Sequence, residues 1–142
     1  MKKICTIIVI GVLILLGILT FVLVDSSSNK LSEDYSKDEV IARAKEVVEL
    51  MNALDYSAIN NEIREDLQEN LSVEKLENVL AQKIDNAAEF TEYTSITITG
   101  QKSKSTGEDY ATAILMCKYE NSNITYVISM DKNMDIVGIY LK

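Results

Sequence analysis

The chain of 142 residues contains no histidine, no proline and no tryptophan, and it has two cysteines. Histidine is the commonest general base and metal ligand near neutral pH, so its absence excludes Ser-His and Cys-His catalysis within this chain. Cys5 lies in an apolar N-terminal run and Cys117 in a strand-like segment, which predicts that no disulfide joins them. Stability is therefore expected to come from an apolar core rather than from disulfide bridges.

Basic residues are also scarce, with 14 lysines and arginines against 22 aspartates and glutamates. Lys2 and Lys3 account for two of the basic residues, and residues 1–24 hold no acid. Residues 25–142 therefore carry 22 acidic against 12 basic side chains, a balance of −10. A domain with this negative charge repels the phosphate backbone of nucleic acids. Nucleic acid is not an expected partner.

One long apolar run stands at the N-terminus. Residues 4–24 (ICTIIVIGVLILLGILTFVLV) contain no charged side chain over 21 positions. As a helix this run is about 31 Å long, which matches a bilayer core of about 30 Å. It is also apolar on every side, unlike the amphipathic helices of soluble domains. The sequence predicts one transmembrane helix, and the membrane is the first expected partner.

Two fates are open for this segment. Cleavage after a signal peptide would release a secreted protein, and the serines at residues 26–28 provide small side chains for it. An uncleaved anchor fits the length better, because the apolar core of a signal peptide usually spans about 7–15 residues. Lys2 and Lys3 abut the run, which predicts a cytoplasmic N-terminus and an extracytoplasmic body in a single-pass protein of the cell membrane.

The chain divides into the anchor at residues 1–24, a linker at residues 25–36 and a folded domain at residues 37–142. The linker (DSSSNKLSEDYS) is polar and turn-rich, which predicts a mostly disordered tether. Residues 36–39 (SKDE) form a capping box that starts a helix. Apolar stripes at helical spacing predict three helices. The first ends near residue 54, the second is shorter and starts around Asp55 or Ser57, and the third ends near residue 90. The stripes consist of Val40, Ile41, Ala44, Val47, Val48 and Met51, then Ile59, Ile63 and Leu67, then Leu76, Val79, Leu80, Ile84 and Ala87.

After the helices the apolar period changes from about 3.6 residues to about 2. This alternation predicts strands over residues 94–102, 110–119, 124–130 and 135–141. The connections between them are short and turn-rich, which favours an antiparallel meander. Helices grouped before strands predict an α+β fold, with three N-terminal helices packed on one face of a four-stranded sheet.

Three segments resemble a known family. Residues 48–56 (VELMNALDY) resemble the end of the first helix in domains of the nuclear-transport-factor-2-like, or cystatin-like, type. Residues 126–131 (YVISMD) and 136–140 (IVGIY) resemble the last two strands of the bacterial family called domain of unknown function 3887. The resemblance spans residues 38–142. It implies a curved sheet wrapped around the first helix as a cone with an open end, and it brings no catalytic residues.

Tyrosines are the one enrichment that suggests a site. Seven are present, and Tyr110, Tyr119, Tyr126 and Tyr140 fall on predicted strands, where together they could line a concave sheet face as a ligand site. The competing interpretation places them at core edges, as β propensity alone would. Cys117 is expected to pack in the core, because an activated thiol needs a positively charged, partly exposed setting.

Acidic clusters suggest no metal site. The carboxylates at residues 62–77 fit solvated helix faces, and residues 131–135 (DKNMD) fit a hairpin turn better than a calcium loop. No cofactor, metal ligand or catalytic residue is predicted.

Three functions remain open at this level. The first is a non-enzymatic, membrane-tethered extracytoplasmic domain that binds a protein or a small molecule. The second is a small enzyme that uses Tyr with Asp or Glu as acid and base in a cavity, which needs a buried carboxylate with a raised pKa. The third is a structural domain that forms a homodimer through its sheet.

Overall fold

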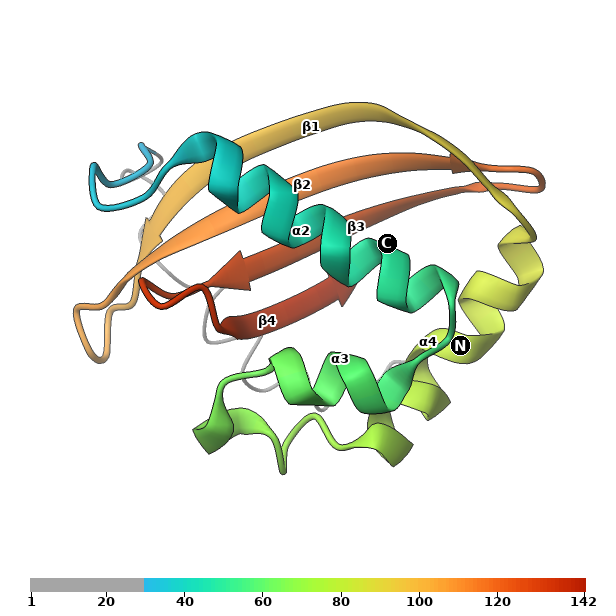
Figure 1. Cartoon of the computed structure of the whole chain (residues 1–142), viewed down its shortest axis with the longest axis horizontal. Coiled ribbons are helices and arrows are strands. Elements are labelled where there is room, and N and C mark those ends of the chain that lie inside the picture. Colours follow the sequence, from blue (N-terminus) through green and yellow to red (C-terminus); the bar gives the residue numbers. More distant parts are fainter. Residues whose placement is uncertain (1–29) are drawn as a thin grey trace.

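The computed structural model describes residues 30–142 as three α-helices and a 3-10 helix followed by a four-stranded sheet (Figure 1). The predicted anchor at residues 4–24 and the linker residues 25–29 lie outside the described residues. Within residues 30–142, none of the helices has the length and apolarity needed to cross a bilayer. The elements are α2 (Lys37–Asn52), α3 (Tyr56–Glu62), η1 (Glu65–Leu67), α4 (Val73–Ala87), β1 (Phe90–Lys102), β2 (Asp109–Tyr119), β3 (Asn123–Met130) and β4 (Ile136–Leu141).

The α-helices begin where the sequence supplies side-chain caps. Ser36, Asp55 and Ser72 each accept a hydrogen bond from the backbone N–H three residues later, at 3.4, 3.1 and 3.3 Å. Such caps satisfy one of the free N–H groups of the first turn. The predicted starts of the first and third helices are confirmed. Leu76, Leu80 and Ile84 of the third stripe are buried. Val79 lies at the edge of this stripe and is 39% exposed.

The predicted second helix is shorter than the sequence indicates. It ends at Glu62, and Ile63 turns to an extended conformation with φ −79° and ψ 140°. Ile63 then forms a parallel bridge with Ile136 of β4, and the Arg64 N–H donates to the Ile136 carbonyl at 2.8 Å. Pairing with the sheet therefore replaces the last predicted turn of the helix, and it buries the Ile63 side chain.

The sheet is an antiparallel meander with the strand order β1-β2-β3-β4, as the sequence predicts. Its long strands curve over α2, which runs across one face (Figure 1). Leu115, Tyr126 and Ile128 face α2 from the middle of the sheet and are fully buried. We call this the helix-covered face and its reverse the outer sheet face. Three helices followed by a four-stranded antiparallel sheet confirm the α+β prediction, with α2 packed across the sheet and α3 and α4 packed chiefly against neighbouring helices.

The packed domain also includes residues that the sequence assigns to the linker. Tyr35 is buried, and its hydroxyl donates to the Asp109 carbonyl at 2.7 Å. Leu31 packs against the core. The chain crosses β1 directly over Gly100, where an added Cβ would lie 2.8 Å from the Leu31 Cα and closer still to the Lys30 carbonyl. Tyr35 thus fastens residues 30–35 to the sheet, upstream of the predicted domain start at residue 37.

Gly100→Ala is expected to push this crossing segment off β1. The clash is with backbone, which cannot rotate away, so we expect the free energy of unfolding to fall by about 1–3 kcal/mol, as for other overpacked sites. Urea unfolding of the full chain in detergent measures the loss, and limited proteolysis between residues 25 and 36 should become faster. Thr91→Ala on the same strand is the control, because Thr91 is exposed. Equal unfolding and cleavage of the two variants would contradict the crossing.

Candidate functional site

Two of the four candidate tyrosines meet under α2. Tyr119 and Tyr126 are buried on the helix-covered face, and their hydroxyl oxygens lie 2.6 Å apart. The Tyr119 hydroxyl also donates to the side-chain oxygen of Asn52 on α2. The pair is therefore a buried polar bridge between the sheet and the helix that crosses it.

The other two tyrosines lie on the outer sheet face. In the strand register Tyr110 is opposite Gln101 and Tyr140 is opposite Val127, one residue out of phase with the buried set. Tyr140 is 42% exposed. Tyr110 is half-buried and donates to the Glu108 carboxylate at 3.0 Å. The structure brings Tyr119 and Tyr126 together and separates both from Tyr110 and Tyr140 by the thickness of the sheet.

Burial keeps the core phenols and the thiol protonated. It raises the pKa of Tyr126 and of Tyr119, and it raises the pKa of the Cys117 thiol to about 11. Cys117 faces α2 from β2 and is fully buried. A protonated group without access to solvent is a poor base or nucleophile at neutral pH. These side chains belong to the packing of the domain.

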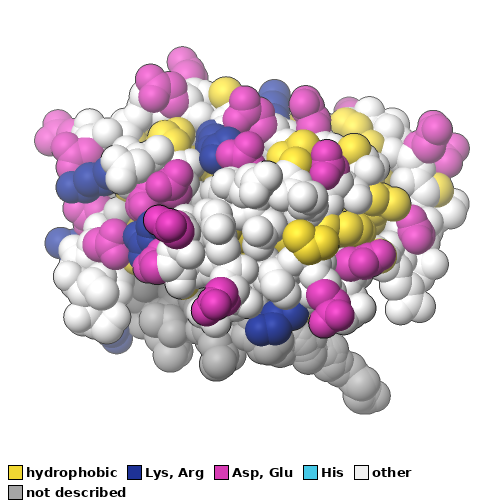
Figure 2. All heavy atoms as spheres, turned by 60° about the horizontal axis from the view of Figure 1, so that its bottom comes forward, with side chains coloured by type: hydrophobic (Ala, Val, Ile, Leu, Met, Phe, Trp, Pro, Cys, Tyr) yellow, Lys and Arg dark blue, Asp and Glu magenta, His cyan; other side chains and the backbone are white. Residues whose placement is uncertain are grey.

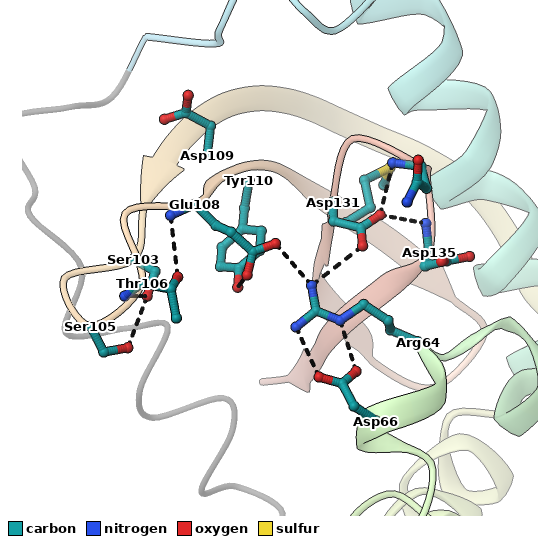
Figure 3. A network of polar contacts seen from close by, with 12 residues as sticks. Arg64, Asp66, Ser103, Ser105, Thr106, Glu108, Asp109, Tyr110, Asp131 and Asp135 are labelled. Carbon is teal, nitrogen blue, oxygen red and sulfur yellow. Dashed lines mark hydrogen bonds and ion pairs between the residues drawn. The ribbon is translucent and has the colours of Figure 1, made fainter.

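Arg64 forms the main polar cluster at the opposite end of the sheet (Figure 3). Its guanidinium donates to Asp66 at 2.8 and 3.3 Å, to Glu108 at 3.0 Å and to Asp131 at 3.3 Å. These carboxylates come from η1, from the β1–β2 loop and from the β3–β4 turn. Hydrogen bonding and charge attraction to them raise the pKa of Arg64. One cation therefore joins three segments that are far apart in the sequence.

Asp131 is the buried carboxylate of the described residues. One of its oxygens accepts from the backbone N–H groups of Asn133 and Asp135, at 2.9 and 3.0 Å, and the other accepts from Arg64. Both oxygens are occupied by the fold. Within residues 30–142, no group of three or more Cys, Asp or Glu side chains is arranged to hold a metal ion.

A polar cavity of about 210 Å³ lies where the chain crosses β1. Lys102 in its wall pairs with Asp109 of β2 at 3.7 Å. Its lining is polar except for one aromatic ring and so does not resemble the apolar pockets that usually hold drug-sized ligands. The lining consists of Lys30, Ser32, Gly100, Gln101, Lys102, Asp109 and Tyr110.

The outer sheet face is different, because its central part carries no charge. Ile114, Val127 and Tyr140 form one row across β2, β3 and β4. Met116 stands beside this row, opposite Thr125, and is 47% exposed. Serine, threonine and glutamine fill most of the remaining central positions, and the first charged side chains occur at the rim. Thr112 and Ser129 among them are buried, with their hydroxyl oxygens 3.1 Å apart. The alternation assigns Ser95, Thr97, Thr99, Gln101, Tyr110, Thr112, Ile114, Met116, Thr125, Val127, Ser129, Gly138 and Tyr140 to this face.

The sequence points to Tyr110 and Tyr140 of this surface but misses Met116. Residues 110–119 are apolar on both faces in their middle, which is also typical of a strand buried on both sides. The useful signal is the absence of charge at every second position over residues 95–101, 110–116 and 125–129, with the charged pair Glu92 and Lys118 following at the rim.

Residues 44–139 match the family described as "Protein of unknown function (DUF3887)". This chain belongs to the DUF3887 family. The match begins inside α2 and ends inside β4, so it contains most of the outer sheet face and all of the Arg64 cluster.

A solved structure supports the same fold. The NMR structure of a protein from Ruminococcus gnavus ATCC 29149 is similar to this chain, with a TM-score of 0.70 and 27% sequence identity. The similarity covers 79% of this chain and 96% of that one. No curated protein is similar to this chain.

Proposed function

We propose that this DUF3887 domain is a non-enzymatic, membrane-tethered extracytoplasmic interaction domain that binds a protein through its outer sheet face. One observation carries the proposal: the centre of this face has no charged side chain, although residues 25–142 carry a balance of −10. Depletion of charge, with an exposed methionine and an exposed tyrosine, is typical of the core of a protein interface.

The remaining polar groups support binding rather than catalysis. An acid–base enzyme needs a carboxylate beside an accessible cavity. Asp131, the buried carboxylate of the described part of the chain, is instead held by Arg64 and two backbone N–H groups. The Tyr119–Tyr126 pair is closed off by α2. Each of these groups has a role in packing that accounts for its position.

Charge decides the chemistry of the partner. Figure 2 shows acidic side chains scattered over the side of the molecule where α3 and α4 lie, with few basic ones among them. A basic partner would bind more favourably to that acidic side than to the outer sheet face. An uncharged face is best matched by another surface with few charges, because neither surface then loses hydration of an ion. The partner we propose is a protein surface of serine, threonine and apolar side chains.

The tether limits where that partner lies. The proposed anchor ends at residue 24, and residue 30 already belongs to the described domain, which by the family resemblance is a cystatin-like cone. Residues 25–29 span at most about 18 Å even when fully extended. The domain would therefore stay close to the membrane surface. A partner in the same membrane or at its surface is within reach of the sheet.

Photo-crosslinking in intact membranes tests the proposal. A photoreactive residue at Met116 probes the outer sheet face, and one at Val79 probes α4 with a similar exposed fraction, 47% against 39%. We expect a discrete crosslinked product from position 116 alone. Raising the salt should leave it unchanged, because an uncharged interface is not screened.

Thr125→Glu provides the matched variant, since Thr125 lies opposite Met116 on the same face. The added charge is expected to abolish the product from position 116. A product from position 79 that disappears at high salt would overturn the proposal in favour of a basic partner on the acidic side.

A further inference from the structure

β1 is an edge strand with an open side. It pairs with β2 along one side, and among residues 30–142 no strand pairs with the other. It is also the longest strand, with 13 residues. The opposite edge is partly occupied, because Ile63 and Arg64 pair with Ile136 at the start of β4. An open edge presents free N–H and C=O groups that can pair with another chain.

Residues 95–99 of this edge lack the features that usually prevent such pairing, whereas residues 30 and 31 cover the strand at Gly100. The bulges of β1 occur before residue 95, so residues 95–100 (SITITG) run in regular register. They contain no charge and no proline, the two commonest means of blocking an edge. Ile96 and Ile98 pack against the core but remain partly exposed along this edge. An added strand would cover both side chains.

We infer that β1 pairs with β1 of a second copy of this chain, antiparallel, about a two-fold axis through Thr97. Such pairing sets Ser95 opposite Thr99 and Ile96 opposite Ile98 of the partner copy, so threonine meets serine and isoleucine meets isoleucine. Matched cross-strand pairs of this kind stabilise antiparallel sheets. An isologous contact of one segment with itself closes as a dimer.

The absence of charge in residues 95–100 permits contact with a second copy, and the self-complementary pairing, with Ser95 opposite Thr99 and Ile96 opposite Ile98, selects that copy over a foreign strand. Two domains that each carry a balance of −10 repel one another, and residues 95–100 are a place where they can meet without placing acids side by side. The inference also rests on the proposed tether, because two copies anchored in one membrane share a thin layer and have a raised effective concentration.

The dimer would enlarge the proposed binding surface. A two-fold axis perpendicular to the sheet keeps α2 of both copies on one side and both outer sheet faces on the other. Thr97 and Thr99 then lie at the middle of one continuous uncharged surface, with Met116 of each copy flanking it. The edge and the face thus serve different contacts, and separate variants can test them.

Disulfide trapping tests the pairing in the full chain in native membranes. In a Cys5→Ser background, Thr97→Cys places two thiols across the axis, with Cα atoms about 4.5–5.5 Å apart, which is within the range of disulfide bonds. We expect a crosslinked dimer at least about tenfold faster than from Thr125→Cys, which lies on β3 away from the axis. Cys117 is buried and contributes no background.

Thr97→Lys completes the test, because it sets two like charges across the axis on an exposed position. It is expected to convert the dimer to a monomer by size measurement of the detergent-solubilised chain, while the fold stays intact by circular dichroism. Equal trapping of Thr97→Cys and Thr125→Cys, or an unchanged mass for Thr97→Lys, would overturn the pairing. Crosslinking from position 116 to a foreign protein reports on the proposed function independently of either result.

Discussion

Raising the pH from 9 to above 11 is expected to lower the free energy of unfolding by about 3 kcal/mol through Cys117 alone. Burial raises the pKa of this thiol from 9.0 to about 11, so the unfolded chain releases the proton at lower pH than the folded one. The contribution of the buried thiol to stability is therefore fully present below pH 9 and is lost progressively as the pH rises toward about 11. Burial also raises the pKa of Tyr93 to about 12, which extends the loss in the same direction.

Urea unfolding of the full chain at a series of pH values measures this loss. Cys117→Ala is the matched variant, because it keeps a small apolar side chain and removes the titrating thiol. Its unfolding free energy should depend less on pH than that of the parent chain between pH 9 and 11. A parent chain that is equally stable throughout this range would show that Cys117 is not buried as described.

Arg64→Met is expected to lower the free energy of unfolding by about 2–3 kcal/mol. The variant keeps the aliphatic stem but leaves Asp131, whose side chain is 8% exposed, without its cation. Breaking a fully buried pair costs about 3–5 kcal/mol, and the partial exposure of Arg64 reduces the expected value. Chemical denaturation of the full chain in detergent provides the measurement.

Two further variants separate the partners of Arg64. Asp66→Asn should cost no more than about 0.5 kcal/mol, because the Asp66 side chain is 62% exposed and water screens the pair. Asp131→Asn in the Arg64→Met background should recover part of the loss, since an amide oxygen still accepts from the Asn133 and Asp135 N–H groups. Equal losses from Arg64→Met and Asp66→Asn would contradict a structural role for the buried contact.

Most of the fold follows from local signals in the sequence. Ser36 and Ser72 cap their helices as predicted, and the period-2 alternation locates all four strands to within a few residues. Two features did not follow. Ile63 leaves its helix for a partner 73 positions away, and Gly100 is a glycine because residues 30 and 31 cross it. Contacts between distant segments leave no periodic trace in either segment.

The candidate site was harder to predict than the fold. Propensity places tyrosines on strands, and their separation of nine residues puts Tyr119 and Tyr110 on opposite faces of β2, but which of the two faces is covered depends on where α2 packs. Arg64 gave no signal, because Glu108 and Asp131 are 44 and 67 positions away, in two different turns. Met116 lies in a segment that is apolar on both faces, so its exposure follows from the position of α2 and not from the local pattern.

Oxidation of the native methionines tests most directly whether the outer sheet face is occupied in the membrane. Met116 is 47% exposed on that face, while Met134 is half-buried in the β3–β4 turn away from it. Dilute peroxide is expected to oxidise Met116 several-fold more slowly in intact membranes than in the solubilised, diluted chain, with Met134 equally reactive in both. Equal oxidation of Met116 in the two preparations would contradict a bound partner on the outer sheet face.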